Sequence, residues 1–216
     1  MIRHHPELDL LTDYATGALA EGEALSVSCH TALCDLCRQQ VREVEQIGGD
    51  ILGGLDPVDL QPDALQRALS QIDEPGAPPA VTTVDHETRN MLPSPLWHYV
   101  AGGMSKLRWR RVTPALSSAR LTLSRDGHRV DLLRIAAGRP VPRHTHEGNE
   151  LTLVLAGGYT DDTGHFARGD FTHADGGLTH RPVADPGEDC IALAVLDAPV
   201  LPTGLIGRLL HPLIRD

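Results

Sequence analysis

The sequence predicts a two-domain protein in which a small bundle of helices is followed by a β-barrel or β-sandwich. Apolar residues recur at helical spacing up to about residue 70 and at every second position beyond about residue 107. Between these regions, residues 73–95 contain five prolines and little apolar periodicity, which is typical of a linker. At 216 residues, the chain is long enough for two modest domains, each with its own core.

The first domain is predicted over residues 1–75 as three or four helices. Two apolar patterns with helical spacing support it, formed by Leu8, Leu11, Ala15, Ala18 and Leu19, and then by Leu25, Leu33, Leu36, Val41 and Val44. The glycine pairs Gly48-Gly49 and Gly53-Gly54 are expected to interrupt the second pattern. Pro62 suits the first turn of a further short helix that continues to Ile72.

The second domain is predicted over residues 96–200, after a linker at residues 76–95. Five short segments with alternating apolar residues, separated by Gly, Asp and Pro turns, are Leu107–Val112, Ala119–Leu123, Val130–Ile135, Glu150–Leu155 and Asp189–Val195. Short strands at such intervals are typical of a β-sandwich or small barrel. Residues 201–216 are expected to form a short amphipathic helix packed on this domain.

The charge of the chain is concentrated in the first domain. Residues 1–75 hold 4 Arg and 14 Asp or Glu, a net charge of −10, whereas residues 76–216 hold 15 basic and 15 acidic residues. A module of this charge repels phosphates, so direct nucleic-acid binding is excluded and a basic protein partner is favoured. The N-terminus lacks the apolar run of a signal peptide, and no stretch is apolar enough to span a membrane. A cytoplasmic protein is therefore expected.

Three residues of the acidic domain have the types and spacing of metal ligands. His30, Cys34 and Cys37 would lie within a 60° arc of one helix or helix end, if each residue turns the helix by about 100°. His4 or His5 could supply a fourth ligand and complete a closed structural zinc site. The rival interpretations are a redox pair of cysteines and a set of buried small residues with a chance histidine. Cys29 points away from His30 and is not expected to bind metal.

The His-x₃-Cys-x₂-Cys motif in a small acidic helical domain resembles the zinc-binding anti-sigma domains of bacteria. The resemblance implies that zinc holds the helices together while the domain wraps a sigma factor and blocks its access to RNA polymerase. It also favours the histidine immediately before the first helix, His5, as the fourth ligand over His4.

A second motif lies in the neutral half of the chain. Gly138-x₅-His144-x-His146-x₃-Glu150-x₆-Gly157 matches the first signature of the cupin barrels, a double-stranded β-helix or jelly-roll fold. His144 and His146 are two apart and therefore share one face of a strand, and Glu150 begins the next strand. The second signature is met in part, because His180 is retained while Asp175 and Ala184 replace its Pro and Asn. Three imidazoles and a carboxylate suit Zn, Fe(II), Mn or Ni.

The order of the two motifs along the chain resembles the ChrR-type anti-sigma factors. This resemblance implies that the helical domain sequesters an extracytoplasmic-function sigma factor in a heterodimer. It implies further that the cupin senses singlet oxygen or peroxides and promotes release, with no catalytic activity. The alternative is a cupin metalloenzyme, a dioxygenase or isomerase, with a helical regulatory domain. A third and weaker hypothesis is a metal-storage or structural protein, which would leave the acidic helical domain unexplained.

Overall fold

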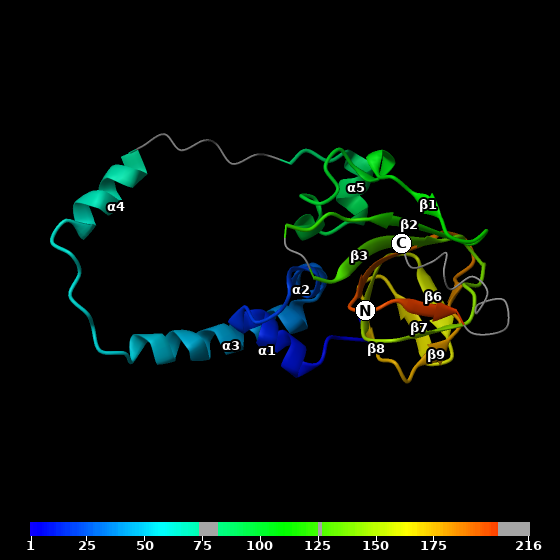
Figure 1. Cartoon of the computed structure of the whole chain (residues 1–216), viewed down its shortest axis with the longest axis horizontal. Coiled ribbons are helices and arrows are strands. Elements are labelled where there is room, and N and C mark those ends of the chain that lie inside the picture. Colours follow the sequence, from blue (N-terminus) through cyan, green and yellow to red (C-terminus); the bar gives the residue numbers. More distant parts are fainter. Residues whose placement is uncertain (74–81, 125–126, 203–216) are drawn as a thin grey trace.

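The computed structural model describes residues 1–73, 82–124 and 127–202. Its helices come first and its antiparallel sheets second, which confirms the predicted fold class. The helices of the first domain are α1 (Leu8–Thr16), α2 (Glu21–Leu33), α3 (Asp35–Gly53) and α4 (Ala64–Asp73). Figure 1 shows α1 to α3 beside the β domain and α4 standing apart from both.

The first three helices pack around a small core of their own. Leu11, Val27 and Val41 are buried there together with Cys34 and Cys37, so each of the three helices contributes at least one apolar side chain to it. The chain reverses direction after α1 at Gly17, whose φ of 73° lies in the left-handed region that glycine adopts without strain.

The predicted interruption at Gly48-Gly49 is wrong, because α3 continues through both residues and ends at Gly53. Neither glycine has a neighbouring atom within 4 Å of a Cβ position. Each therefore costs the helix only about 1 kcal/mol of stability relative to alanine, which α3 tolerates. The predicted stop at the second glycine pair agrees with the end of α3.

The β domain consists of twelve described strands in three antiparallel sheets. The large sheet has the order β1-β2-β3-β11-β5-β8, and the small sheets have the orders β10-β6-β7 and β12-β4-β9. The strand bounds are Arg110–Arg111 (β1), Leu116–Arg120 (β2), Arg129–Ile135 (β3), His144–His146 (β4), Glu150–Ala156 (β5), Gly158–Asp161 (β6), Gly164–Ala167 (β7), Phe171–Ala174 (β8), Thr179–His180 (β9), Val183–Ala184 (β10), Cys190–Leu196 (β11) and Val200–Pro202 (β12).

The large sheet is covered on both faces, and strand alternation decides which residues each face receives. Along β5, Leu151, Leu153 and Leu155 belong to the core shared with the helices. Val154 belongs to a second core, within the barrel, which also contains Cys190. Since side chains alternate along a strand, Glu150 lies on the same face as Val154 and points to the barrel interior.

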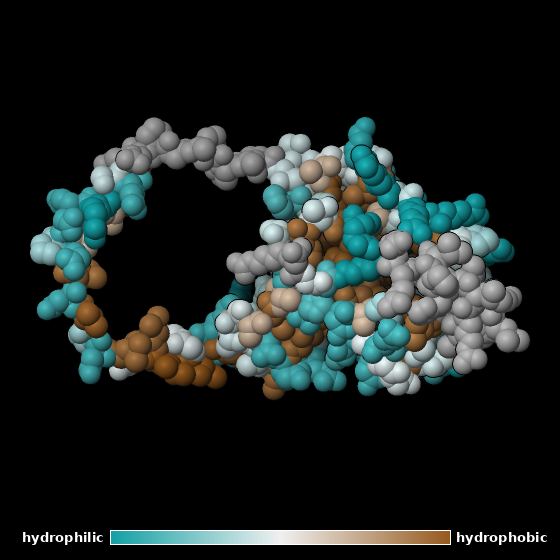
Figure 2. Space-filling view, in the orientation of Figure 1, coloured by the Kyte–Doolittle hydropathy of each residue, from teal (hydrophilic) through white to brown (hydrophobic). Residues whose placement is uncertain are grey.

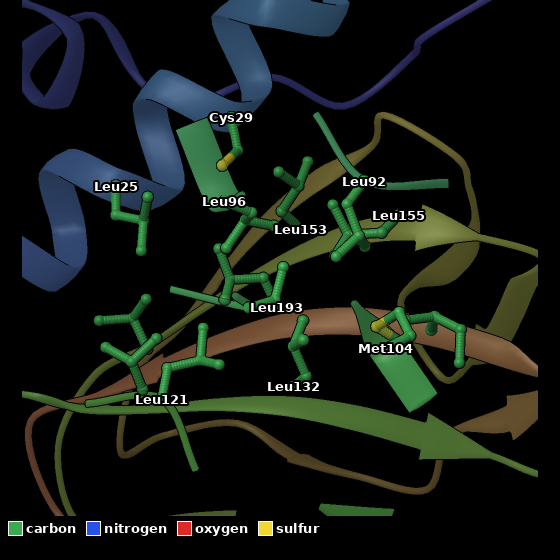
Figure 3. Close-up of a cluster of buried hydrophobic side chains, with 14 of the residues drawn as sticks. Leu25, Cys29, Leu92, Leu96, Met104, Leu121, Leu132, Leu153, Leu155 and Leu193 are labelled. Atoms are coloured by element: carbon green, nitrogen blue, oxygen red, sulfur yellow. The ribbon is translucent and has the colours of Figure 1, made fainter. Parts of the chain in front are cut away.

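Helix α2 is a common element of both domains, since it packs on the outer face of the large sheet. Its Leu25 and Cys29 are buried against Leu153, Leu193 and neighbouring side chains, as Figure 3 shows. Cys29 is thus a core residue, in agreement with the expectation that it does not bind metal.

The segment predicted as a linker contains local structure where it is described. Helix α5 (His86–Met91) begins at Asp85, whose side chain accepts a hydrogen bond from the Thr88 N–H, and a 3₁₀ turn follows at Ser94–Leu96. Leu92 and Leu96 are buried in the core shared with α2. The C-terminal helix predicted at residues 201–216 does not begin at Leu201, because Leu201 and Pro202 belong to strand β12, and the rest of the prediction lies outside the described residues. None of the helices in the described part of the chain has the length and hydropathy needed to cross a bilayer.

Candidate metal centres

The structure brings His5, His30, Cys34 and Cys37 together. Each offers one ligand atom, and all four atoms lie within 4.8 Å of one another. Nδ1 of His5 is 3.4 Å from Sγ of Cys34 and 3.3 Å from Sγ of Cys37, and Nε2 of His30 is 3.3 Å from Sγ of Cys37. His4 is outside this group, because its ring packs 4.5 Å from that of Phe166.

The three ligands predicted on one helix come from two helices and the junction between them. Cys34 is extended, with φ −117° and ψ 108°, so α2 ends before it and α3 begins after it. Its N–H donates to the His30 carbonyl and its own carbonyl accepts from the Arg38 N–H, which satisfies one exposed group at each helix end. The break redirects Cys37 toward His30, so the arc calculated for a continuous helix does not describe the site.

The donor set fits a closed tetrahedral metal site. Zinc bound to a thiolate at 2.3 Å and an imidazole at 2.05 Å would hold these two ligand atoms about 3.6 Å apart, near the distances observed. The proton of His30 is on Nδ1, which donates to the Gly169 carbonyl at 2.9 Å, so Nε2 presents a lone pair to the cluster. Two thiols and two imidazoles form the composition of a structural zinc site.

Burial makes the first cluster unfavourable for charge without a cation. It raises the pKa of the Cys37 thiol to about 12, with a contribution from neighbouring Cys34, and lowers the pKa of the His30 imidazole to about 4. Both groups are therefore neutral in the metal-free protein near pH 7. A bound cation would stabilise the negative charge of a Cys37 thiolate. Metal binding would therefore release the thiol proton.

The second cluster consists of His144, His146 and His180, whose ligand atoms also lie within 4.8 Å of one another. His144 on β4 is paired with His180 on β9, and their Nε2 atoms are 3.0 Å apart. Nε2 of His146 is 3.4 Å from Nε2 of His180. Three ring nitrogens from the neighbouring strands β4 and β9 thus converge on one point.

The other ring nitrogens of this cluster establish which tautomers are present. Nδ1 of His180 donates to Asp161 at 2.7 Å, and Nδ1 of His144 donates to the Pro142 carbonyl at 2.8 Å. The Nε2 atoms of His144 and His180 therefore carry lone pairs that face each other, an arrangement that a cation would stabilise. Burial also lowers the pKa of His144, which favours the neutral, ligating form.

Glu150 lies beside the three histidines, outside the group of mutually close ligand atoms. Its Oε2 is 3.0 Å from Nδ1 of His146, without the alignment of a hydrogen bond, and its Oε1 accepts from Thr152. Burial opposes ionisation, but His146, His144 and Thr152 together hold the pKa of Glu150 below its ordinary value. Glu150 is thus an anionic neighbour that faces the convergent imidazoles.

Comparisons with known proteins show the family to which this chain belongs. The ChrR cupin-like domain model matches residues 99–198. The anti-sigma-E factor ChrR of Cereibacter sphaeroides is 37% identical over 99% of this chain and 99% of that protein. The chain belongs to the ChrR family of anti-sigma factors. The crystal structure of Rhodobacter sphaeroides SigE in complex with the anti-sigma ChrR matches with a TM-score of 0.79 and 38% identity, covering 91% of this chain and 100% of that chain.

Membership of the ChrR family also decides between the two classes of function predicted above. Both relatives match over nearly their whole lengths and both are anti-sigma factors. The alternative of a cupin metalloenzyme is therefore set aside.

The ChrR-family chain has a cleft between its N-terminal segment and the barrel. Its volume is about 800 Å³, and residues of both clusters line it. The lining residues are Arg3, His4, His5, Glu7, Glu150, Thr152, Tyr159, Asp161, Thr163, Phe166, Phe171, Thr172, His173, Ala174, Asp175, Leu178 and His180. The same cleft thus borders His5 of the first cluster and His180 of the second.

Sequence reasoning missed two carboxylates that position residues in or beside the two clusters of this ChrR-family chain. Asp161, which accepts from His180, belongs to a stretch that reads as a turn, and its partner is 19 positions away. Asp170 accepts from the N–H groups of Arg3 and His4, more than 160 positions away. No local pattern marks either residue, because the contacts form only when distant segments meet.

Proposed function

We propose that this protein is an anti-sigma factor that binds an extracytoplasmic-function sigma factor through its helical region, residues 1–75, in a heterodimer. The observation that carries the proposal is an exposed apolar surface on an acidic helical segment. Large apolar side chains are exposed along α3, the following loop and α4, namely Ile47, Ile51, Leu52, Leu55, Val58, Leu60, Leu65, Leu69 and Ile72. Figure 2 shows part of this surface in brown on α3.

Such a surface is unusual for a protein that acts alone. Large apolar side chains left exposed along one segment of the chain favour an interaction site, because their transfer from water to an interface is favourable. We call the nine residues of the preceding paragraph the apolar arm. The arm lies in the region that carries the net charge of −10, so it suits a partner with basic residues around an apolar groove. The related ChrR is in complex with SigE, which agrees with this kind of partner.

In this proposal, His5, His30, Cys34 and Cys37 bind one structural zinc ion. The ion would join the N-terminal segment, the end of α2, the junction at Cys34 and the first turn of α3. A single cation would therefore determine the angle at which α3, and with it the apolar arm, leaves the core. His144, His146, His180 and Glu150 would bind a second divalent metal, which can be Zn, Fe, Mn or Ni.

The proposed role of the barrel, residues 96–200, is to sense oxidative stress from singlet oxygen or peroxides and to promote release of the sigma factor. Two features support this role. The second cluster is built of oxidisable imidazoles, and it borders a cleft that also contains His5. A change at the barrel cluster would weaken sigma binding only through contacts that differ between the bound and released states.

Co-expression with the candidate sigma factor tests the division of labour. We expect wild type to retain both the partner and zinc through purification, and Cys34→Ala to lose both, because one of two thiolates is removed. Cys29→Ala is the matched control, since Cys29 is a buried cysteine of α2, the helix that ends just before Cys34, and lies in the hydrophobic core. The proposal is wrong if Cys34→Ala holds the partner with undiminished zinc.

The apolar arm is tested separately. Leu52→Glu places a charge on a side chain that is 70% exposed, so we expect the sigma factor to dissociate while zinc content and thermal stability remain unchanged. Val112→Glu introduces the same charge at an exposed apolar residue of the β domain and should leave binding unchanged. Equal binding by the two variants would exclude the arm as the docking surface.

A further inference from the structure

The N-terminal segment Ile2–Pro6, here called the strap, is attached to the barrel. The N–H groups of Arg3 and His4 donate to Oδ1 of Asp170 at 2.6 and 3.0 Å, and the His4 carbonyl accepts from the Phe171 N–H at 3.0 Å. Ile2 packs directly over Gly169. In Figure 1 the N-terminus accordingly lies against the β domain rather than beside α1. The strap therefore delivers His5 to the first cluster from an anchor on the barrel.

The same turn of the barrel also holds a second residue of that cluster. Gly169, Asp170 and Phe171 form the end of the β7–β8 turn, and the Gly169 carbonyl accepts the hydrogen bond from Nδ1 of His30. The Phe171 ring lies edge-on to the His30 ring at 5.7 Å. Three consecutive barrel residues thus contact the strap or His30 directly.

Asp170 has the environment of a group that organises this turn. It is 2% exposed, and besides the two strap N–H groups it accepts a hydrogen bond from the Ala167 N–H at 2.8 Å. A buried carboxylate with three backbone donors is stable only while all of them remain in place. Two of the three belong to the strap, so Asp170 joins the turn and the strap into one unit.

From these contacts we infer that Asp170 is a positioning residue for the N-terminal metal site, so that the barrel supplies the outer shell of a site whose ligands all lie in the helical region. The inference rests on the ligand set proposed above. It also gives a physical route from the barrel to that site. β8 begins at Phe171 and pairs with β5, in which Glu150 lies opposite Ala174, so the same two strands connect the second cluster to the anchor of the strap.

Because the affinities of two coupled sites change reciprocally, the coupling acts in both directions. A change in the barrel that loosens the β7–β8 turn withdraws support from His5 and His30. The N-terminal site then binds its metal more weakly, and the angle of α3 is no longer held.

Titration of the metal-free full-length protein with Co²⁺ tests this inference. Sulfur-to-cobalt charge-transfer absorption reports only the first cluster, because the second contains no cysteine. Asp170→Asn should weaken Co²⁺ binding at the thiolate site by about tenfold, the lower end of the effect of losing a direct outer-shell partner, because Asp170 acts through the strap and the turn at Gly169. Asp131→Asn is the matched control, since Asp131 is also 2% exposed, lies on β3 and pairs with Arg120 and Arg129.

A second pair of variants tests the strap without altering the barrel core. Arg3→Pro removes the N–H that donates to Asp170, whereas Arg3→Ala keeps it and removes only the side chain. We expect Arg3→Pro to weaken Co²⁺ binding as Asp170→Asn does, and Arg3→Ala to bind like wild type. This pair decides the question if Asp170→Asn does not fold.

The two levels of the proposal fail in different ways. If wild type shows no thiolate charge-transfer absorption, the metal site itself is wrong and the role of Asp170 falls with it. If wild type shows the absorption but Asp170→Asn and Arg3→Pro bind Co²⁺ within about twofold of their controls, the site stands and the positioning role is overturned.

Discussion

Cys34 shows how one residue can determine the geometry of a site. A continuous helix from Glu21 onward would have placed Cys34 and Cys37 on one face with His30. The extended backbone at Cys34 instead makes it the C-terminal cap of α2 and the N-terminal cap of α3. Its side chain is then free to face the histidine from the strap, and the two helices can meet at an angle.

At the residue scale, Asp161 is expected to control metal binding at the barrel cluster. Asp161→Asn weakens the partner that holds the proton on Nδ1 of His180, so metal affinity at this cluster should fall by about ten- to hundredfold. Metal analysis after dialysis against a weak chelator measures the loss. Asp162→Asn alters the adjacent, exposed carboxylate that pairs with Arg143 and should retain the metal. Equal metal content in both variants would contradict the assignment.

His30 predicts how the stability of the metal-free protein depends on pH. Its folded-state pKa of about 4 lies below its ordinary value of 6.5. As pH falls through 6.5 the unfolded chain binds a proton that the folded chain does not, so the contribution of His30 to stability is lost between about pH 6.5 and 4 and is constant above this range. The loss from this one group is up to about 3 kcal/mol. Urea denaturation at a series of pH values should show this decline in wild type and a smaller one in His30→Gln.

At the scale of elements, α2 and α3 differ in what surrounds them. Helix α2 is buried between the small helical core and the large sheet, and it contributes to both cores. Helix α3 is packed only along its first half, where Cys37 and Val41 are its buried residues, and its second half projects into solvent. Helix α2 is therefore stabilised by packing. The second half of α3 is stabilised by its own helix propensity and, in the proposed complex, by contact with the partner.

Two glycine-to-alanine variants measure this difference. In Gly22→Ala on α2, the new Cβ would lie 2.7 Å from Val130 and 3.2 Å from Val195, so we expect a loss of about 1–3 kcal/mol in the free energy of unfolding. Gly48 on α3 has no atom within 4 Å, so Gly48→Ala should stabilise α3 by about 1 kcal/mol. Chemical denaturation tests the first change and amide hydrogen exchange within α3 the second. Effects of the same sign would contradict this account of the two helices.

At the scale of the whole molecule, the two predicted domains share structure instead of merely being linked. Leu25 and Cys29 of α2 complete the outer core of the sheet, and the strap returns to the barrel through Asp170. The charge is nevertheless divided sharply, since the net −10 belongs to residues 1–75 alone. One folded unit thus combines an acidic helical region, which we propose faces the sigma factor, with a neutral barrel.

The charge division predicts that association with the sigma factor depends on salt. Attraction between the acidic helical region and a basic partner acts over the Debye length, which shrinks to about 3 Å in 1 M salt. We expect the association rate constant to fall by about tenfold or more between low salt and 1 M NaCl, with a smaller change in the dissociation rate constant. Surface plasmon resonance measures both. An association rate that does not change with salt would place the contact on the neutral half.

Much of the fold, and most residues of both clusters, could be predicted from patterns of residues that are close together in the sequence. Helical and alternating periodicity depend on neighbours within a few residues, and so do the spacings of His30, Cys34 and Cys37 and of His144 and His146. The sequence by itself therefore determined the order of helices and sheets, the residue types of the two clusters, the family resemblance and the division of charge.

Only the tertiary structure decided how those parts meet. It broke the helix at Cys34, placed His5 instead of His4 in the first cluster, and set α2 into the core of the barrel. It also brought Asp170 to the strap across 167 positions of the chain. These outcomes depend on the packing of segments that are far apart in sequence. Such contacts impose no periodic pattern on the sequence of either segment, so no local pattern could predict them.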